Sequence, residues 1–401
     1  MINVGVFGYG TVGSGVVEVL TENASLIERK VGDKVNVKWI LDLRDFPGDK
    51  HEKKITHDVK DILNDPEVKV ICETMGGTGA AFEFTKEALK KGISVCTSNK
   101  ELVASHGPEL LSLAKENNCS YKFEASVGGG IPIIRPLQDC ITADEVEAVI
   151  GIVNGTTNYM LTKMTNEAAE FDAVLKEAQK NGFAEANPDA DIKGFDACRK
   201  IAILSSLVYG KTVNYEDIHT EGITNISARD IKYAKALGLK VKLLAKYEKL
   251  ETGAYALVAP HLVPTTNPLY HVNEVFNGIL VRGNMLGDAM FYGRGAGKLP
   301  TASAVCSDVV ELAKNVGKNI PCDWVDEPVK LDGLKNSRKA FFIRVGAELK
   351  KEAKENFKVV KEVHLNFYDE YAFVTDVMTE EEFEAATAKV GKLINYIRIE
   401  K

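Results

Sequence analysis

The chain has 401 residues, a length that suits two or three domains and is too long for one average domain. Apolar residues make up 45% of it and charged residues 27%, which is near the globular average and excludes disordered and fibrous classes. The 50 basic and 57 acidic residues give a formal charge of −7, which lacks the basic excess that a nucleic-acid binder needs.

No apolar run approaches the roughly 18–20 residues of a membrane span, and the N-terminus has a buried-strand pattern without a basic leader or cleavage site. We therefore expect a soluble cytoplasmic protein that acts without a membrane. The seven cysteines are scattered and contain no Cys-x-x-Cys pair, so we expect reduced thiols rather than a disulfide framework or a zinc site.

The first third of the chain alternates short β-branched runs with helical patterns. This order predicts a βαβ series, with a mostly parallel sheet and helices on both of its faces. The predicted strands are 2–7, 35–43, 68–73, 93–97 and 121–124, and the predicted helices are 16–29, 84–91 and 108–117.

A glycine-rich segment follows the strand 2–7 and opens a helix. It reads Gly8-Tyr9-Gly10-Thr11-Val12-Gly13, the G-x-G-x-x-G fingerprint in its strand–turn–helix context. Gly8 allows the tight turn, Gly10 lacks the Cβ that would block a pyrophosphate, and Gly13 permits close packing of helix on strand. The helix N-terminus then presents its amides to the anion, so a Rossmann-type dinucleotide site is predicted.

The end of the strand 35–43 carries two opposed signals about the cofactor. Asp42 is the residue type that binds the ribose diol of NAD, whereas Arg44, with Lys50 nearby, suits the 2′-phosphate of NADP. Arg44 favours NADP. Because Arg44 can also be a solvated strand end, the choice between NADP and NAD stays open.

The rest of the chain predicts two further parts. Strands at 147–153, 255–260 and 278–282 alternate with longer helices, as in a second α/β domain, and a helix at 302–316 could return the chain to the first domain. From residue 340 the pattern is strand 340–345, helix, strands 358–366 and 372–377, helix 380–390 and strand 394–399. This order resembles a ligand-sensing module of the ACT type, but the Pro-Gly turn usual after its first strand is missing.

These patterns predict an α/β protein with an N-terminal Rossmann-type parallel sheet, a central α/β domain and a small C-terminal ACT-like α+β module. The predicted limits are 1–130 for the dinucleotide-binding domain, 131–290 for the central α/β domain, 291–330 for the returning helix and 336–401 for a degenerate ACT-like module.

Five motifs occur in an order that resembles the homoserine dehydrogenase family, and the likeness runs from the first strand to about residue 316. The motifs are Glu73-Thr74-Met75-Gly76-Gly77, Thr97-Ser98-Asn99-Lys100-Glu101, Glu124-Ala125-Ser126-Val127-Gly128-Gly129-Gly130-Ile131-Pro132, Asn154-Gly155-Thr156-Thr157-Asn158-Tyr159 and Phe291-Tyr292-Gly293-Arg294-Gly295-Ala296-Gly297-Lys298-Leu299-Pro300-Thr301.

The resemblance implies reversible, NAD(P)H-dependent reduction of L-aspartate 4-semialdehyde to L-homoserine, on the route to threonine and methionine. It also implies a set of cofactor-binding residues. These are Phe7, Gly8, Gly10, Thr11, Val12, Gly13, Arg44, Thr74, Ser98, Lys100, Gly182, Gly293 and Gly295.

Hydride transfer to an aldehyde places negative charge on its oxygen, so the site needs a proton donor and an electropositive group. Asp196 and Lys200 lie four residues apart and share one helix face, where an arbitrary pair would form only a surface salt bridge. Their order matches the active-site helix of the family, so we expect Lys200 to donate the proton and Asp196 to orient it. Lys100 follows the strand 93–97 and is expected to polarise the carbonyl and contact the cofactor, although a surface lysine is the simpler explanation.

The substrate also carries an α-ammonium group, which requires fixed acids. Two positions depart from the family pattern: Phe183 stands where Tyr is usual, and Asn187 where Asp is usual, which removes a hydroxyl and a negative charge. The substrate-binding residues implied by the resemblance are Glu185, Asp191, Asp196, Thr156 and Lys100.

Glu124 precedes a glycine-rich bend that could point several carbonyls, together with the carboxylate, at a hard cation. The predicted metal residues are Glu124, Val127, Gly129 and Ile131, and by resemblance the ion is Na⁺. The alternative is a Glu124 carboxylate satisfied by backbone amides. The resemblance further implies a homodimer or tetramer, while the degenerate C-terminal module predicts weak or absent inhibition by threonine.

Two other functions compete with this interpretation. A phosphorylating semialdehyde dehydrogenase would need a cysteine nucleophile paired with a histidine, and no cysteine here has that setting. A nucleotide-sensing regulator without catalysis would leave the combination of Asp196, Lys200 and Lys100 unexplained.

Overall fold

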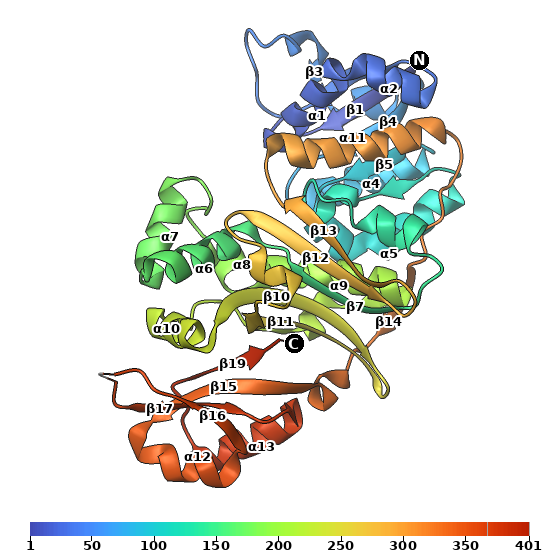
Figure 1. The fold of residues 1–401 in the computed structure, drawn as a ribbon. Helices are drawn as coiled ribbons and strands as arrows, with labels where there is room; N and C mark the ends of the chain where they lie inside the picture. Colours follow the sequence, from blue (N-terminus) through green and yellow to red (C-terminus); the bar gives the residue numbers. More distant parts are fainter. Residues whose placement is uncertain (367, 401) are drawn as a thin grey trace. The chain divides into compact units, whose positions relative to one another are not determined.

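The computed structural model describes residues 1–366 and 368–400, and the chain divides into two compact units (Figure 1). The first unit consists of Met1–Ala143, Ala202–Asn214 and Gly293–Val329. The second consists of Asp144–Ile201, Tyr215–Tyr292 and the chain from Lys330 onward. Since both units combine segments that are distant in sequence, the four contiguous domain ranges stay predictions.

A parallel sheet forms the centre of the first unit, and this confirms the predicted N-terminal Rossmann-type fold. Its strands follow the order β3-β2-β1-β4-β5-β6, so the chain reverses direction across the sheet between β1 and β4. The strands are β1 Ile2–Phe7, β2 Val35–Leu41, β3 Ile55–Thr56, β4 Val68–Glu73, β5 Ser94–Thr97 and β6 Tyr121–Lys122; β8 Lys211–Val213 and β14 Val325–Val329 pair separately.

The two faces of this sheet follow from the alternation of side chains along β1. Val4 and Val6 belong to a buried cluster that includes residues of α1 and α11, whereas the ring of Phe7 meets Phe84 of α4. The helices are α1 Thr11–Glu22, α2 Ala24–Val31, α3 Val59–Leu63, α4 Gly79–Lys90, α5 Lys100–Glu116 and α11 Lys298–Lys314.

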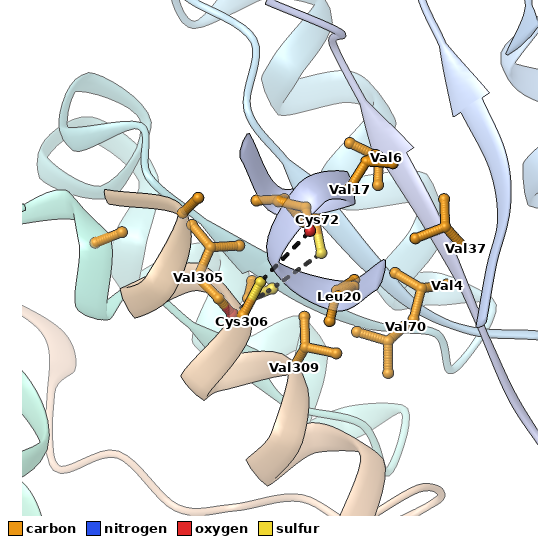
Figure 2. Close-up of a cluster of buried hydrophobic side chains, with 14 of the residues drawn as sticks. Val4, Val6, Val17, Leu20, Val37, Val70, Cys72, Val305, Cys306 and Val309 are labelled. Carbon is orange, nitrogen blue, oxygen red and sulfur yellow. Dashed lines mark hydrogen bonds between the residues drawn. The ribbon is translucent and has the colours of Figure 1, made fainter. Parts of the chain in front are cut away.

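Helix α11 contributes to the hydrophobic core of the first unit although it lies almost 300 residues after β1. Figure 2 shows Val305, Cys306 and Val309 of this helix among the side chains of β1, α1, β2 and β4. Burial of these apolar groups stabilises the unit by removing them from water. The labelled partners are Val4, Val6, Val17, Leu20, Val37, Val70 and Cys72.

All three helices predicted in the first third of the chain had wrong limits, and the one expected at 84–91 is α4, which begins at Gly79. The helix expected at 16–29 is the pair α1 and α2, which meet at Asn23, a residue whose side chain favours helix ends over helix interiors. The helix expected at 108–117 is only the second half of α5, because Asn99 caps that helix by accepting a hydrogen bond from the Leu102 amide at 3.1 Å.

A mixed sheet runs through the second unit in the order β13-β12-β7-β10-β11-β19-β15-β17-β16, with β9 paired to β11 and β18 to β15. The predicted strands 147–153, 255–260 and 278–282 lie on β7, β11 and β12. The strands are β7 Val146–Ile152, β9 His219–Thr220, β10 Leu239–Leu250, β11 Gly253–Pro264, β12 Phe276–Gly283, β13 Gly287–Arg294, β15 Arg338–Gly346, β16 Val359–Val363, β17 Glu370–Thr375, β18 Met378–Thr379 and β19 Asn395–Ile399.

Strand β10 was not among the predicted strands, because its lysines suggest exposure. Lys242 and Lys246 are buried: the first donates to the Val272 carbonyl and the second to Glu400 Oε2 at 2.6 Å. These partners satisfy the ammonium groups inside the unit. The helices of the second unit are α6 Gly155–Glu167, α7 Phe171–Lys180, α8 Asp189–Ile192, α9 Phe195–Tyr209, α10 Ala228–Leu237, α12 Lys350–Asn356 and α13 Glu380–Val390; the end of α9 belongs to the first unit.

The C-terminal strands and helices join the sheet through β19, which pairs in parallel with β11. Arg398 of β19 is buried and donates to Glu380 Oε1 at 2.6 Å and to Glu221 Oε1 at 2.8 Å. The predicted helix 380–390 coincides with α13, and the predicted strand 394–399 differs from β19 by one residue.

Within the described residues, none of the helices combines the length and the apolar character needed to cross a membrane. The cytoplasmic location stays a prediction. Cys140 is exposed and Cys322 partly exposed, and the buried thiols are those of Cys72, Cys96, Cys119, Cys198 and Cys306.

Candidate active site

The glycine loop of the first unit has the geometry that the fingerprint predicts. Gly8 has φ +88°, a left-handed conformation that favours glycine, and a Cβ added to Gly13 would lie 1.9 Å from the Gly8 carbonyl oxygen. Thr74, after β4, fixes this turn by donating its hydroxyl hydrogen bond to the Phe7 or Gly8 carbonyl, each 2.9 Å away. Thr74 therefore fixes the glycine loop to the end of β4, and the loop has no room for a side chain at Gly13.

The start of α1 is open where a cofactor phosphate would approach. A Cβ added to Gly10 would meet no heavy atom within 4 Å, and Gly10 caps α1 without any side-chain hydrogen bond. Thr11 and Val12 begin the helix, so their amides belong to its positively polarised end. These residues fit a dinucleotide pyrophosphate.

Asp42 and Arg44 form one unit beside the loop. Arg44 donates to Asp42 through Nε at 2.9 Å, Nη2 at 2.9 Å and its main-chain amide at 3.0 Å, and the Tyr9 amide donates at 2.8 Å. The Arg44 hydrogen bonds hold the pKa of Asp42 well below its usual range. Because a carboxylate has about four lone-pair sites, Asp42 is saturated by these donors.

A cleft of about 660 Å³ borders this pair. Its lining combines the loop residues Tyr9, Gly10 and Thr11 with cationic Arg44, Lys50 and Lys298 and with acidic Glu18, Glu22 and Asp49. Lys298 is paired with Glu18 at 2.7 Å, so Arg44 and Lys50 are the cations that a phosphate bound here would meet.

The glycine bend after β6 uses the Glu124 carboxylate differently from the prediction. Its Oε1 accepts from the amides of Ile133 and Ile134 at 2.6 and 2.9 Å, and its Oε2 from the Arg135 amide at 2.7 Å. The alternative interpretation, a carboxylate satisfied by backbone amides, therefore describes its contacts. Asp308 of α11, which sequence reasoning missed, accepts from the Glu124 amide at 2.9 Å.

The bend packs against the segment that follows β13. Gly129 has φ +57°, and a Cβ there would lie 2.4 Å from the Gly295 carbonyl oxygen, while one on Gly293 would lie 3.2 Å from Ile131 Cγ1. The Gly130 amide donates to the Arg294 carbonyl at 3.1 Å. Glycine at these positions permits two backbone segments to touch, which is a structural role for residues predicted to contact cofactor or metal.

Lys100 is the first residue of α5, directly beyond the carboxyl end of β5, as predicted. Ser98 lies in the same turn, and its amide donates to the Glu73 carbonyl at 3.4 Å. The structure thus brings Thr74, Ser98 and Lys100 to the strand ends where ligands bind on parallel sheets.

In the second unit, Lys200 and Asp196 contact each other as their spacing predicts. The Lys200 ammonium donates to Asp196 Oδ2 at 2.7 Å and to the Val153 carbonyl at 2.7 Å. Lys200 is 8% and Asp196 5% exposed, so this ion pair is buried rather than a surface salt bridge. Two acceptors fix the direction of the ammonium group.

Asn154 joins the two acids, and sequence reasoning did not assign it to the site. Its Nδ2 donates to Asp191 Oδ1 at 2.7 Å and to Asp196 Oδ2 at 2.8 Å, while its Oδ1 accepts from the Thr157 amide at 2.9 Å and so caps α6. A polar residue between a strand and a helix was the available signal. Its partners, about 40 positions later, could not be inferred from spacing.

The ionised form of Asp191 is disfavoured within this cluster. Burial raises the pKa of Asp191 above its usual value, and the charge of nearby Asp196 acts in the same direction. The Asn154 amide and the Lys200 charge oppose this rise. The arrangement therefore suits a further cation next to Asp191.

Two other predicted substrate residues, Glu185 and Thr156, lie near this cluster and differ in their contacts. The Glu185 side chain is exposed and lies outside the hydrogen-bonded cluster in the described residues, with its main-chain carbonyl accepting from Gln179 at 3.1 Å. Thr156 donates to the Phe183 carbonyl at 2.6 Å, and Gly182 ends α7 with φ +74°. Gly182 is thus explained as a helix terminator.

The two departures from the family pattern have local roles. The Phe183 ring lies 4.8 Å from that of Tyr159, so it is held by an aromatic contact. Asn187 Oδ1 accepts from the Asp189 amide at 3.2 Å, a bond that the usual aspartate could also accept.

Comparisons with known families and proteins agree with one another. A family model described as "Homoserine dehydrogenase" matches residues 132–310, and one described as "Homoserine dehydrogenase, NAD binding domain" matches residues 8–124. The homoserine dehydrogenase of Bacillus subtilis is 42% identical over 319 residues, which cover 79% of this chain and 73% of that protein. That of Synechocystis is 43% identical over 317 residues, covering 78% and 73%.

Solved structures give the same result for the fold. A homoserine dehydrogenase from Thiobacillus denitrificans has a TM-score of 0.90 at 34% identity, covering 100% of this chain and 98% of that chain. The S. aureus enzyme at pH 8.5 has a TM-score of 0.82 at 32% identity, covering 100% and 98%. A hyperthermophilic archaeal homoserine dehydrogenase in complex with NADPH has a TM-score of 0.68 at 30% identity, covering 80% and 99%.

The bridge made by Asn154 leads to a test. Asn154→Ser keeps an N-cap acceptor for α6 but removes the amide group that joins Asp191 to Asp196. Because hydrogen bonds to charged groups contribute about 1.5–3 kcal/mol, kcat/KM should fall about 10–100-fold. Steady-state kinetics measures this loss, and thermal unfolding measures the loss of stability that accompanies removal of a hydrogen bond from the buried acids.

The matched control is Asn267→Ser, the same exchange at an asparagine that caps a short 3₁₀ helix, Pro268–His271. Its kinetics should equal those of the wild type. An Asn154→Ser enzyme with wild-type kcat/KM would show that the bridge has no role in catalysis.

Proposed function

The chain belongs to the homoserine dehydrogenase family, and we propose that Lys200 exchanges the proton of its reaction. The protein is an NAD(P)-dependent oxidoreductase that acts on a CH–OH group in the synthesis of aspartate-family amino acids. This family assignment argues against the two competing functions, a phosphorylating semialdehyde dehydrogenase and a regulator without catalysis. The observation that supports the role of Lys200 is its buried, two-point attachment to Asp196 and Val153.

The reaction reduces an aldehyde carbon and protonates its oxygen. The bound nicotinamide supplies the hydride. Lys200 Nζ gives a proton to the oxygen as negative charge develops there, and in homoserine oxidation the neutral amine takes the hydroxyl proton back. Asp196 and the Val153 carbonyl hold Nζ in place through both directions.

The acids of the cluster bind the substrate ammonium in this proposal. Asp191 is held by Asn154 and partly exposed, so an α-ammonium group beside it would offset its burial and favour its ionised form. Glu185, which is exposed, would have to turn toward the substrate to join it. Thr156 and Lys100 keep the roles that the family likeness implies, as proposals.

Replacement of Lys200 tests the proposal directly. Lys200→Met keeps much of the side-chain volume but removes the transferable proton, so kcat should fall about 10²–10⁴-fold, the usual contribution of a general acid. Because the dinucleotide loop lies elsewhere in the chain, the Kd for NADPH should stay near its wild-type value. Absorbance of NADPH during semialdehyde reduction and fluorescence titration measure the two quantities.

Lys176→Met, on the exposed side of α7, is the matched control and should leave kcat unchanged. Wild-type turnover in Lys200→Met would remove Lys200 from proton transfer. A large loss of NADPH affinity in that variant would instead assign it to cofactor binding.

We propose NADP as the preferred cofactor. Asp42, the residue that would bind the ribose diol of NAD, already accepts four hydrogen bonds, and three of them hold Arg44 at the edge of the cleft. Arg44 and Lys50 then present positive charge to a 2′-phosphate. The archaeal relative in complex with NADPH is consistent with this choice.

Arg44→Ala tests the preference. Loss of a charge-assisted bond of about 1.5–3 kcal/mol should lower kcat/KM for NADPH about 10–100-fold. The same variant releases Asp42 for a ribose diol, so kcat/KM for NADH should stay equal or rise. The ratio of the two values is the measurement, and Arg29→Ala, exposed at the end of α2, is the charge-matched control. An unchanged ratio would exclude Arg44 as the determinant.

The Na⁺ site remains a proposal with a reduced set of ligands. Three amides take up three of the roughly four acceptor sites of the Glu124 carboxylate, so this side chain holds the bend and could offer a cation at most one further contact. Main-chain carbonyls of Val127, Gly129 and Ile131 are the oxygen ligands that a hard, singly charged cation would use. The cation would stiffen the bend and would take no part in proton transfer.

We also propose that the protein is a homodimer or tetramer, as the family likeness implies. Strand β13 is the outer strand at one end of the second unit's sheet, and Met285 and Leu286 in the turn before it are 83% and 52% exposed. An unpaired strand edge with apolar side chains beside it is suited to contact another copy.

The C-terminal module is proposed to act as a structural brace with little response to threonine. Its first strand, β15, runs into Gly346 and the short α12 without the Pro-Gly turn that typical modules use to hold an effector. Threonine added to the reductase assay should therefore leave the rate nearly unchanged. Strong, saturable inhibition in that titration would show that the module still senses threonine.

A further inference from the structure

Glu73 is a buried carboxylate that the reaction described above does not use. It is the last residue of β4 and is 0% exposed, between the carboxyl ends of β1 and β5 in the parallel sheet. A carboxylate at such a depth is costly unless every oxygen has a partner. Glu73 therefore lies next to the turns after β4 and β5, which carry the predicted cofactor residues Thr74 and Ser98.

Both oxygens of Glu73 accept hydrogen bonds. Oε1 accepts from the Met75 amide at 2.7 Å, and Oε2 from the Thr97 hydroxyl at 2.5 Å. The Thr97 oxygen in turn accepts from the Asn99 amide at 2.9 Å. The carboxylate thus ties the turn after β4 to the turn after β5.

Each of these turns leads to a residue of the dinucleotide site. Thr74, between Glu73 and Met75, holds the glycine loop through the Phe7 and Gly8 carbonyls. Asn99 caps α5, which begins at Lys100, and its Nδ2 donates to the Gly77 carbonyl at 2.7 Å.

The direction of these bonds favours the ionised form. The Met75 amide and the Thr97 hydroxyl both donate to the carboxylate, whereas a proton on Oε2 would turn the carboxyl into the donor and deprive the Thr97 hydrogen of its acceptor. Burial raises the pKa of Glu73 to about 7, against the lowering effect of bonds from Thr97, Met75 and Asn99. Its charge therefore changes in the neutral range.

Two neighbouring groups, Tyr121 and Cys96, stay uncharged in the neutral range. Burial raises the pKa of Tyr121, on β6, well above its usual value, and burial does the same for the Cys96 thiol on β5. His57 is farther away, beside Asp42, and the bond of its ring nitrogen to the Asp42 carbonyl raises its pKa.

We propose that Glu73 is a positioning residue whose ionised form fixes the turns carrying Thr74 and Lys100, and so sets the affinity for the dinucleotide. The inference rests on the proposed placement of the cofactor at the glycine loop. Protonation of Glu73 reverses the Thr97 bond and leaves the hydrogen of the buried Thr97 hydroxyl without its acceptor, which weakens the link between the turn after β4 and the start of α5. Affinity should then rise as pH rises from about 6 to about 8.

Glu73→Gln is the principal test, because it keeps the shape and removes the charge. The Kd for NADPH and NADH is measured by nicotinamide fluorescence between about pH 6 and pH 8.5. Wild type and variant should agree within about twofold near pH 6 and differ about tenfold near pH 8, as linkage of one proton allows. NADH, which lacks the titrating 2′-phosphate, separates the protein's contribution from that of the ligand.

A purely structural role for Glu73 would give the same Kd ratio at every pH, and that result would contradict the proposal. So would a wild-type affinity that weakens as pH rises, since direct repulsion between carboxylate and phosphate has that sign. His57 titrates in both proteins, so it cancels in the ratio.

Two further variants keep the test decisive. Thr97→Val removes the hydroxyl that links Glu73 to Asn99 and should reproduce the loss near pH 8 even if Glu73→Gln folds poorly. Glu83→Gln, exposed on α4, should behave as wild type at every pH.

Gly13→Ala separates this inference from the cofactor placement on which it rests. A Cβ at Gly13 would collide with the Gly8 carbonyl, so this variant should lose NADPH binding at every pH. Retained binding in Gly13→Ala would overturn the placement of the cofactor. Lost binding there, together with wild-type pH dependence in Glu73→Gln, would overturn only the role of Glu73.

Discussion

The second unit depends on keeping a charged lysine inside the protein. Removing an ammonium and a carboxylate from water is costly, and the attraction between them offsets the cost only when their other lone pairs and protons are also satisfied. Lys200 and Asp196 meet this condition through the Val153 carbonyl and the Asn154 amide. Breaking such a pair leaves an uncompensated buried charge and costs about 3–5 kcal/mol. The N-terminus of α6, the end of β7 and the first turns of α9 are thereby fixed relative to one another.

The first unit depends on a different constraint, the close approach of backbone to backbone. At Gly13 and Gly129 an added Cβ would lie 1.9 and 2.4 Å from a carbonyl oxygen, which no side chain allows. At Gly10 the space is open, so glycine there leaves room for something outside the chain. Glycine is thus required by internal packing at two positions of the chain, whereas at Gly10 the strand–turn–helix context, and not the contacts, points to a ligand.

The sequence predicted correctly those features of the site that depend on residues close together in the chain. The spacing of Asp196 and Lys200 predicted their contact, and the strand–turn–helix context predicted the glycine loop, because both depend on neighbours within a few residues. Asn154 was missed because its partners come from α8 and α9, and β10 was missed because its buried lysines are paired only in the folded unit. Glu124 resembled a cation ligand until the direction of the amides after the bend was known. Tertiary partners, which spacing does not encode, account for all three differences.

Glu221 links strand β19 to the segment that carries Asp191. Arg398 and Tyr396 of β19 both donate to Glu221 Oε1, at 2.8 and 3.2 Å. The next residues press on the loop before α9: a Cβ at Gly222 would lie 2.1 Å from the Ile192 carbonyl oxygen, and that oxygen accepts from the Ile223 amide at 2.8 Å. Ile192 follows Asp191 directly, so β19 supports the acid cluster through continuous contacts. These contacts give the C-terminal strands and helices a structural role in the second unit, whatever else they bind.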